Sequence, residues 1–327
     1  MDITYLLFLQ DIRNSIHDVP TPLMEWISHF AVAYLPLIAI FIYWCVDKKK
    51  GLYLLASLVV CRAVNALLKL TACVYRPWIK DARILPAGDA ITRATGYSFP
   101  SGHTITATAG YGGIAAAFRD RGKGLVTLCL VLIVLTGFSR NYLGVHTPQD
   151  VLIGLCLGAA ALYGMTRLFA RLEAHPEEED RWLLGGFLFA AAALAYIACK
   201  PYPMDHGPDG ALLVDPQRMM RDGFRDMGLL MGFCAGRYVE KRWVRFRVTG
   251  VDARGVALAS LGIALLSLLQ ACLNVYMKAA FGGHWGRLLT SFILVFFAVA
   301  VWPAVIGRCT GLGSDEYKIG RCNFSDM

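Results

Sequence analysis

Long apolar stretches separated by short polar loops run along most of the chain. Nine of them approach or reach the length of about 20 residues that an α-helix needs to cross a bilayer. The predicted spans are residues 27–46, 51–72, 103–118, 124–138, 148–169, 182–199, 224–239, 255–277 and 286–306. We therefore predict an all-α, polytopic transmembrane helix bundle of about nine spans. Eight spans are the alternative, because Arg225, Asp226 and Arg237 crowd the ends of the seventh stretch.

Basic residues are concentrated in every second loop. The loops concerned follow the first, third, fifth and seventh spans, and they contain Lys48 to Lys50, Arg119 to Lys123, Arg167 to Arg181 and Lys241 to Arg254. Positively charged loops stay preferentially on the cytoplasmic side of a membrane. The intervening loops are therefore predicted to face the non-cytoplasmic side, and they comprise residues 73–102, 139–147, 200–223 and 278–285.

The composition supports a membrane protein and argues against a soluble one. Of the 327 residues, 56% are hydrophobic and 17% are charged, whereas soluble domains carry about 25% charged residues. The net charge of +8 would suit nucleic acid, but the basic residues form short clusters between apolar runs, so we predict no nucleic-acid partner. Most of the ten cysteines lie within apolar runs, and no Cys or His spacing suits zinc. We predict no metal and no cofactor, and the oligomeric state stays open.

Three regions follow from this pattern. Residues 1–22 mix charged and apolar positions and lack the basic flank and apolar core of a signal peptide, so they are predicted to form an amphipathic interfacial helix. Residues 23–175 hold the first five spans and are predicted to form the catalytic core. Residues 176–327 are predicted to form a helical extension of about four spans, followed by a cytoplasmic tail.

Three polar segments lie beside the predicted non-cytoplasmic ends of the spans. The first contains Lys69 and Arg76, which are seven residues or two helical turns apart. This spacing predicts that both lie on one face of the second span, and Pro77 is expected to end that helix. A lysine in this position can also simply extend its ammonium group to the lipid head groups.

The second segment runs from Ser98 to Thr104. Ser101 is predicted to cap the third span, and Gly102 allows a ligand to approach the backbone closely. The unpaired N–H groups and the positive dipole at a helix start form an anion site. His103 lies in the first turn of this helix, beside that site.

The third segment runs from Ser139 to Asp150 and includes Arg140. Thr147 is predicted to cap the fifth span, with Asp150 at its third position. Asp150 follows His146 by four residues, so its carboxylate either orients the imidazole or merely caps the helix. Cations gathered beside hydrocarbon are costly without a counter-ion, and a phosphate group would provide one.

These segments resemble the signature of the type-2 phosphatidic-acid phosphatase superfamily. Its motifs Lys-x6-Arg-Pro, Pro-Ser-Gly-His and Ser-Arg-x5-His-x3-Asp match Lys69–Pro77, Pro100–His103 and Ser139–Asp150 without a departure. The resemblance covers roughly residues 60–170, and the span count is similar to that of the glucose-6-phosphatase and sphingosine-phosphate phosphatase branch. It implies a metal-independent phosphoric-ester hydrolase that acts on the phosphomonoester or diphosphate of a lipid.

The resemblance also implies a role for each matched residue. His146 would attack phosphorus and form a phosphohistidine, Asp150 would orient His146, and His103 would protonate the leaving group and then activate water. The phosphate oxygens would be held by Lys69, Arg76, Ser101, Gly102 and Arg140. The protein would lie in the cell membrane of a bacterium or the endoplasmic reticulum of a eukaryote, with its active site on the non-cytoplasmic side.

Other functions are compatible with the same scaffold. The substrate could be a soluble sugar phosphate, or an alcohol could replace water as the acceptor, which would make the protein a phosphotransferase. A transporter or binding protein ranks lower, since binding alone needs no pair such as His146 and Asp150. Vanadium-dependent haloperoxidases have a similar combination of motifs. A haloperoxidase is nevertheless the least favoured function, because the haloperoxidases considered are soluble proteins.

Overall fold

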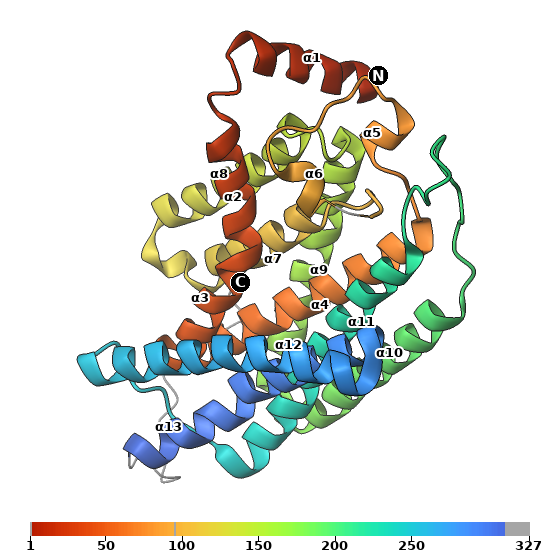
Figure 1. The fold of residues 1–327 in the computed structure, drawn as a ribbon. Helices are drawn as coiled ribbons and strands as arrows, with labels where there is room; N and C mark the ends of the chain where they lie inside the picture. Colours follow the sequence, from red (N-terminus) through yellow and green to blue (C-terminus); the bar gives the residue numbers. More distant parts are fainter. Residues whose placement is uncertain (1, 95, 311–327) are drawn as a thin grey trace.

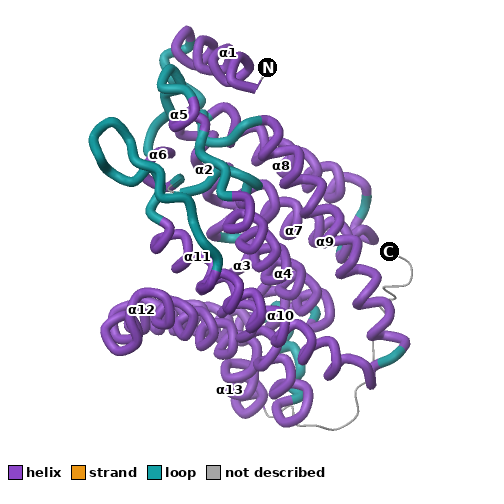
Figure 2. The backbone as a smooth tube through the Cα atoms, turned by 90° about the vertical axis from the view of Figure 1, so that its right-hand side faces the viewer, coloured by secondary structure: helices purple, strands orange, loops and turns teal. Residues whose placement is uncertain are grey.

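Helices joined by loops make up the computed structural model, which describes residues 2–94 and 96–310 (Figures 1 and 2). The first part contains α1 (Asp2–Ser15), α2 (Thr21–Ala33), α3 (Leu35–Phe41), the π-helical turn η1 (Ile42–Val46), α4 (Lys48–Ala72), α5 (Pro77–Lys80), α6 (Ala90–Arg93), α7 (Gly102–Ala117), η2 (Arg119–Arg121), α8 (Lys123–Tyr142) and α9 (Pro148–Ala174). The second part contains η3 (Pro176–Glu178), α10 (Glu179–Cys199), α11 (Pro216–Val239), η4 (Glu240–Val244), α12 (Ala253–Phe296), η5 (Phe297–Val301) and α13 (Trp302–Thr310). The all-α fold class is confirmed for the described residues.

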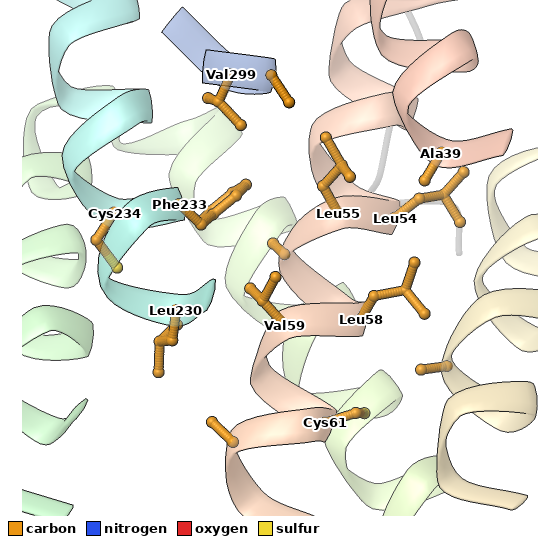
Figure 3. Packing of buried hydrophobic residues seen from close by; sticks show 14 of the residues in the cluster. Ala39, Leu54, Leu55, Leu58, Val59, Cys61, Leu230, Phe233, Cys234 and Val299 are labelled. Atoms are coloured by element: carbon orange, nitrogen blue, oxygen red, sulfur yellow. The ribbon is translucent and has the colours of Figure 1, made fainter. Parts of the chain in front are cut away.

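The central helix is α4, which lies between two layers (Figures 1 and 2). One layer contains α2, α7 and α8, and the other contains α10 to α13. Figure 3 shows Leu55 and Val59 of α4 on the side of Phe233 in α11, whereas Leu54 lies toward Ala39 in α3. Because α4 buries apolar side chains on both sides, the two layers share one hydrophobic core.

Within residues 2–94 and 96–310, five helical segments are long and apolar enough to cross a membrane. A sixth span is obtained if α2 and the segment α3–η1 form one span with a bend of 41° between them. The expected count of about nine spans is therefore not confirmed and stays a prediction. The 16 residues of α7 are fewer than a straight span needs.

The helix α12 is a hairpin rather than one long rod. Gly282 has a φ of +76°, a left-handed value that interrupts the helix and lets the chain turn back. Thr290 Oγ1 donates to the carbonyl oxygen of Leu273 at 3.3 Å. A β-carbon at Gly286 would lie 2.6 Å from the carbonyl oxygen of Met277, so only glycine permits this close approach. The predicted reversal between the last two spans is thus confirmed.

The loops gather at two ends of the bundle. The loops rich in basic residues meet at one end, termed the basic end, through ion pairs between separate elements. These pairs are Lys48–Glu240 (2.6 Å), Lys49–Glu173 (2.6 Å), Lys50–Asp120 (3.9 Å) and Arg237–Glu179 (2.7 Å). The predicted grouping of these loops on one side is confirmed.

The other loops meet at the opposite end, termed the site end. Their contacts include Ser98 N to Val74 O (2.7 Å), Arg76 Nη1 to Val145 O (2.7 Å), Tyr75 Oη to Asp205 Oδ2 (2.6 Å) and His284 Nε2 to Gln217 O (3.1 Å). Which end faces the cytoplasm stays a prediction from the positive-inside bias.

The N-terminal helix α1 rests on the site end. The buried guanidinium group of Arg13 donates to the carbonyl oxygens of Leu85 at 2.7 Å and Tyr142 at 3.2 Å. Gln10 accepts a hydrogen bond from the backbone N–H of Leu85 at 2.7 Å. These contacts do not test the predicted interfacial position of residues 1–22. Residues 311–327 of the predicted cytoplasmic tail lie outside the described residues.

A buried ion pair joins α4 to α11. Arg62 Nη2 donates to Asp226 Oδ1 at 2.7 Å, and the same oxygen accepts from Arg225 Nε at 2.9 Å. The Asp226 side chain is buried and supplies the counter-charge of Arg62, whereas Arg225 also pairs with Asp222 at 3.0 Å.

We predict that Asp226→Asn destabilises the protein, because it removes that counter-charge. Breaking a buried pair costs about 3–5 kcal/mol, so the apparent melting temperature in detergent should fall clearly. The matched control is Asp209→Asn, in an exposed loop, which should leave the melting temperature unchanged. Equal melting temperatures for Asp226→Asn and the unaltered protein would contradict the role given to this pair.

Candidate active site

The three predicted polar segments converge at the site end. The contacts that join them are Arg76 Nη1 to His146 Nε2 (2.9 Å), Lys69 Nζ to Ser98 O (3.0 Å) and Ser101 N to Asp150 O (3.0 Å). Stretches that are far apart in the sequence therefore meet around one imidazole.

The start of α9 fixes the position of Asp150. Thr147 and Asp150 form the predicted capping box, in which Asp150 N donates to Thr147 Oγ1 at 3.3 Å and Thr147 N donates to Asp150 Oδ2 at 2.9 Å. The same Oδ2 lies 3.4 Å from Nδ1 of His146. Asp150 therefore caps the helix and also lies against the imidazole, so the two interpretations of this residue hold together.

Ser98 completes the support of His146, although no role was predicted for this serine. Its hydroxyl donates to Asp150 Oδ2 at 2.5 Å and lies 3.4 Å from Nδ1 of His146. The residue is fully buried. On the other side of the loop, Asn141 Nδ2 donates to the carbonyl oxygen of His146 at 2.9 Å and fixes its backbone.

The second ring nitrogen of His146 faces Arg76. Arg76 Nη1 lies 2.9 Å from Nε2 and also donates to the carbonyl oxygen of Val145, while its Nε donates to that of Gly96 at 3.0 Å. Burial, followed by the positive charge of Arg76, holds the pKa of His146 well below its usual range. The imidazole is therefore neutral at neutral pH, with Nδ1 beside the carboxylate and Nε2 toward the cation.

The prediction that Lys69 and Arg76 share one helix face is wrong. The helix α4 ends at Ala72, because Cys73 adopts a left-handed conformation with a φ of 49°. Pro77 begins α5 instead of ending α4, and a proline disfavours the helical conformation in the residue before it. Arg76 therefore reaches the site from an extended segment.

Lys69 binds the loop that precedes α7. Its ammonium group donates to the carbonyl oxygens of Tyr97 at 3.0 Å, Ser98 at 3.0 Å and Pro100 at 2.9 Å. An ammonium group has three donors, so all of them are used in this arrangement. The side chain thus positions the loop that carries Ser98 and Ser101.

The start of α7 forms another wall of the site. Ser101 caps the helix as predicted, since its Oγ accepts from Thr104 N at 3.5 Å. Gly102 lies close to α4, where a β-carbon would be 3.2 Å from Nδ2 of Asn65. Any larger residue at Gly102 would press against that amide.

His103 is half-buried in the first turn of α7. Within the described part of the chain, its side chain makes no hydrogen bond. Two residues before it, Ser101 donates its backbone N–H to the carbonyl oxygen of Asp150 at 3.0 Å, which places this turn beside the start of α9. The second histidine therefore belongs to the same cluster.

Arg140, in the last turn of α8, has an unused donor. Its Nη1 donates to Oγ of Ser28 in α2 at 2.5 Å, a contact that the sequence did not predict. Its Nε is buried and has no hydrogen-bond partner among the described residues. An unpaired buried donor costs about 1–3 kcal/mol, and a bound anion would satisfy it.

Comparison with known proteins identifies the family of this chain. The PAP2 superfamily matches residues 50–174, and the PAP2 superfamily phosphatase transmembrane extension matches residues 224–314. An undecaprenyl-diphosphatase of Bacillus subtilis is 35% identical over 147 residues, which cover 43% of this chain and 68% of that protein. The chain belongs to the PAP2 superfamily. The matched extension and the apolar helices show that this PAP2 protein is an integral membrane protein.

Two further relatives match shorter parts of this PAP2 protein. An undecaprenyl-diphosphatase of Sulfolobus acidocaldarius is 28% identical over 141 residues, covering 42% of this chain and 65% of the relative. Phosphatidylglycerophosphatase B of Bacillus subtilis is 38% identical over 92 residues, covering 26% of this chain and 44% of the relative. The chain thus spans less than two thirds of either relative. No solved structure matches the chain.

We predict that orthovanadate, an analogue of phosphate, stabilises this PAP2 protein, because the unpaired, buried Nε of Arg140 then gains an anionic acceptor. A ligand present at 100 times its dissociation constant adds about 2.7 kcal/mol to the stability of the folded state. The measurement is the apparent melting temperature in detergent as vanadate is added, with chloride at equal ionic strength as the control. Arg140→Gln should reduce the shift, and an undiminished shift in that variant would contradict the assignment.

Proposed function

We propose that the protein is a metal-independent membrane phosphatase that hydrolyses the phosphomonoester or diphosphate of a lipid through a phosphohistidine. The arrangement of His146 carries this proposal, with Nδ1 3.4 Å from Asp150 and Nε2 2.9 Å from Arg76. A nucleophile that a carboxylate orients, and that faces a cation, suits attack on a phosphate. Two relatives named as undecaprenyl-diphosphatases and one named as a phosphatidylglycerophosphatase support a lipid phosphate as the substrate.

The proposed reaction has two steps. In the first, the Nε2 lone pair of His146 attacks phosphorus, the bond to the leaving oxygen breaks, and His103 gives that oxygen a proton. The carboxylate of Asp150 stabilises the positive charge on the imidazole. In the second step, His103 takes a proton from water, whose oxygen attacks phosphorus and releases inorganic phosphate and neutral His146.

Substrate binding would itself prepare the nucleophile. Arg76 now places an N–H against Nε2 of His146 at 2.9 Å. A phosphate in front of the imidazole would accept that N–H, since guanidinium groups bind phosphate oxygens strongly. The lone pair of Nε2 would then be free for attack. The unpaired Nε of Arg140 and the start of α7 would supply further donors to the phosphate.

The position of the site suits a lipid substrate. It lies at the end of apolar helices, where a head group can enter from water while its chain stays in the bilayer. The basic loops lie at the opposite end, so the positive-inside bias favours a site on the non-cytoplasmic face.

Replacing the nucleophile tests the proposal directly. His146→Ala should abolish phosphate release, because no other group would accept the phosphoryl group. His103→Ala should reduce the rate by about 10²–10⁴, the usual contribution of a general acid. The measurement is phosphate release by the purified protein from lipid phosphates and sugar phosphates, with a chelator present. Near-normal activity of His146→Ala, or loss of all activity with the chelator, would contradict the mechanism.

The role of Ser98 has its own test. Ser98→Ala should lower kcat by about 10–100-fold with little change in KM, because a hydrogen bond to a charged group contributes about 1.5–3 kcal/mol. Ser98→Thr keeps a hydroxyl and should recover part of the rate. The control is Ser57→Ala, at another buried serine, whose hydroxyl has no partner among the described residues. A raised KM with unchanged kcat in Ser98→Ala would show that Ser98 does not act through His146.

A further inference from the structure

A strongly basic cavity lies between α11 and the α12 hairpin, outside the site described above. It is open to the surface and has a volume of about 680 Å³. Its lining includes one carboxylate, Asp222, and five cationic side chains, Arg218, Arg221, Arg225, Lys278 and Arg287. The match to the transmembrane extension starts at residue 224, so most of this cavity belongs to the extension or its immediate approach.

The charges of this cavity are not balanced by the chain. The ion pairs at the cavity are Arg225–Asp222 (3.0 Å), Arg225–Asp226 (2.9 Å) and Arg221–Asp215 (4.0 Å). Among the described residues, Arg218, Lys278 and Arg287 form no ion pair. Cations held together in a confined space repel each other unless an anion joins them.

The fold brings these cations together from two elements. Arg218, Arg221 and Arg225 are spaced by three and four residues, which places them on one face of α11. The reversal at Gly282 then brings Lys278 and Arg287 to the same end of the hairpin. Hence α11 and the hairpin of α12 present these cationic side chains to one cavity.

The basic cavity adjoins the candidate active site. Arg218 also lines a second cavity of about 240 Å³, which it shares with Arg76 and Gly96. The turn of the hairpin is held at the site end by the hydrogen bond from His284 to the carbonyl oxygen of Gln217 at 3.1 Å.

We propose that the basic cavity is a second phosphate-binding site, which makes the extension a determinant of substrate choice. This rests on the proposed function, in which the phosphate that is cleaved binds at His146. Arginine suits the role because its planar fork binds two phosphate oxygens at once. The second phosphate belongs either to the head group of the same substrate or to a neighbouring anionic lipid, and the experiment separates these two sources.

The first arm of the test compares two substrates. Phosphatidylglycerophosphate carries a phosphodiester beside its monoester, whereas phosphatidic acid carries the monoester alone. The variant is Lys278→Gln/Arg287→Gln, and the control with the same change in charge is Arg119→Gln/Arg121→Gln, at exposed positions of the basic end. If the head group of the same substrate supplies the second phosphate, the variant should lower kcat/KM for phosphatidylglycerophosphate about tenfold, as expected for the loss of charge-assisted hydrogen bonds. Both doubles should leave kcat/KM for phosphatidic acid unchanged.

The second arm asks whether a separate lipid supplies the phosphate. Hydrolysis of phosphatidic acid is measured in detergent micelles as phosphatidylglycerol is added. If the cavity binds a separate lipid, the rate of the unaltered protein and of the control will respond to phosphatidylglycerol, and the variant will not. The proposal is overturned if the variant matches the control in both arms, or if it loses activity equally on both substrates.

If the proposed function is wrong, the unaltered protein will release phosphate from neither lipid. The second phosphate-binding site can then still be tested by binding, since the dissociation constants of both lipids can be measured with His146→Ala protein. Adding Lys278→Gln/Arg287→Gln should raise the dissociation constant of phosphatidylglycerophosphate about tenfold and leave that of phosphatidic acid unchanged. Equal constants with and without the double substitution, for these lipids and for phosphatidylglycerol, would overturn the second site.

Discussion

One carboxylate oxygen, Oδ2 of Asp150, holds the site together. It accepts hydrogen bonds from Thr147 N at 2.9 Å and Ser98 Oγ at 2.5 Å, and it lies 3.4 Å from Nδ1 of His146. The start of α9, the loop before α7 and the imidazole are therefore positioned by the same atom. A buried carboxylate needs such partners, because a charge removed from water is stable only when it is paired and hydrogen-bonded. Lys69 supports the arrangement from the far side of that loop.

The parts of the site that sequence predicted well are local in the chain. The capping box of Thr147 and Asp150 depends on residues three apart, and the cap at Ser101 depends on the turn that follows it. Such patterns can be identified because their geometry is set by helical periodicity. The reversal after the eighth predicted span could also be predicted, since a polar, glycine-containing loop separates two apolar stretches there.

What the sequence could not predict depends on contacts between distant segments. Ser98 meets Asp150 across 52 positions, and Ser28 meets Arg140 across 112. Neither serine belongs to a local pattern that reveals its partner. The helix α4 ends at Ala72, where the second predicted span ends, because Cys73 adopts a left-handed conformation that is usually found with glycine or asparagine. Arg76 consequently reaches His146 through an extended segment, although the sequence suggested helical spacing.

The central claim is that His146 carries the phosphoryl group during turnover. The most direct measurement is rapid acid-free quenching of the purified protein with a lipid substrate labelled at its phosphate, followed by peptide mapping of the label. The account predicts a label on His146 that is stable to base and labile to acid, and that is absent from His146→Ala protein. A label on another residue, or steady hydrolysis by His146→Ala protein, would contradict it.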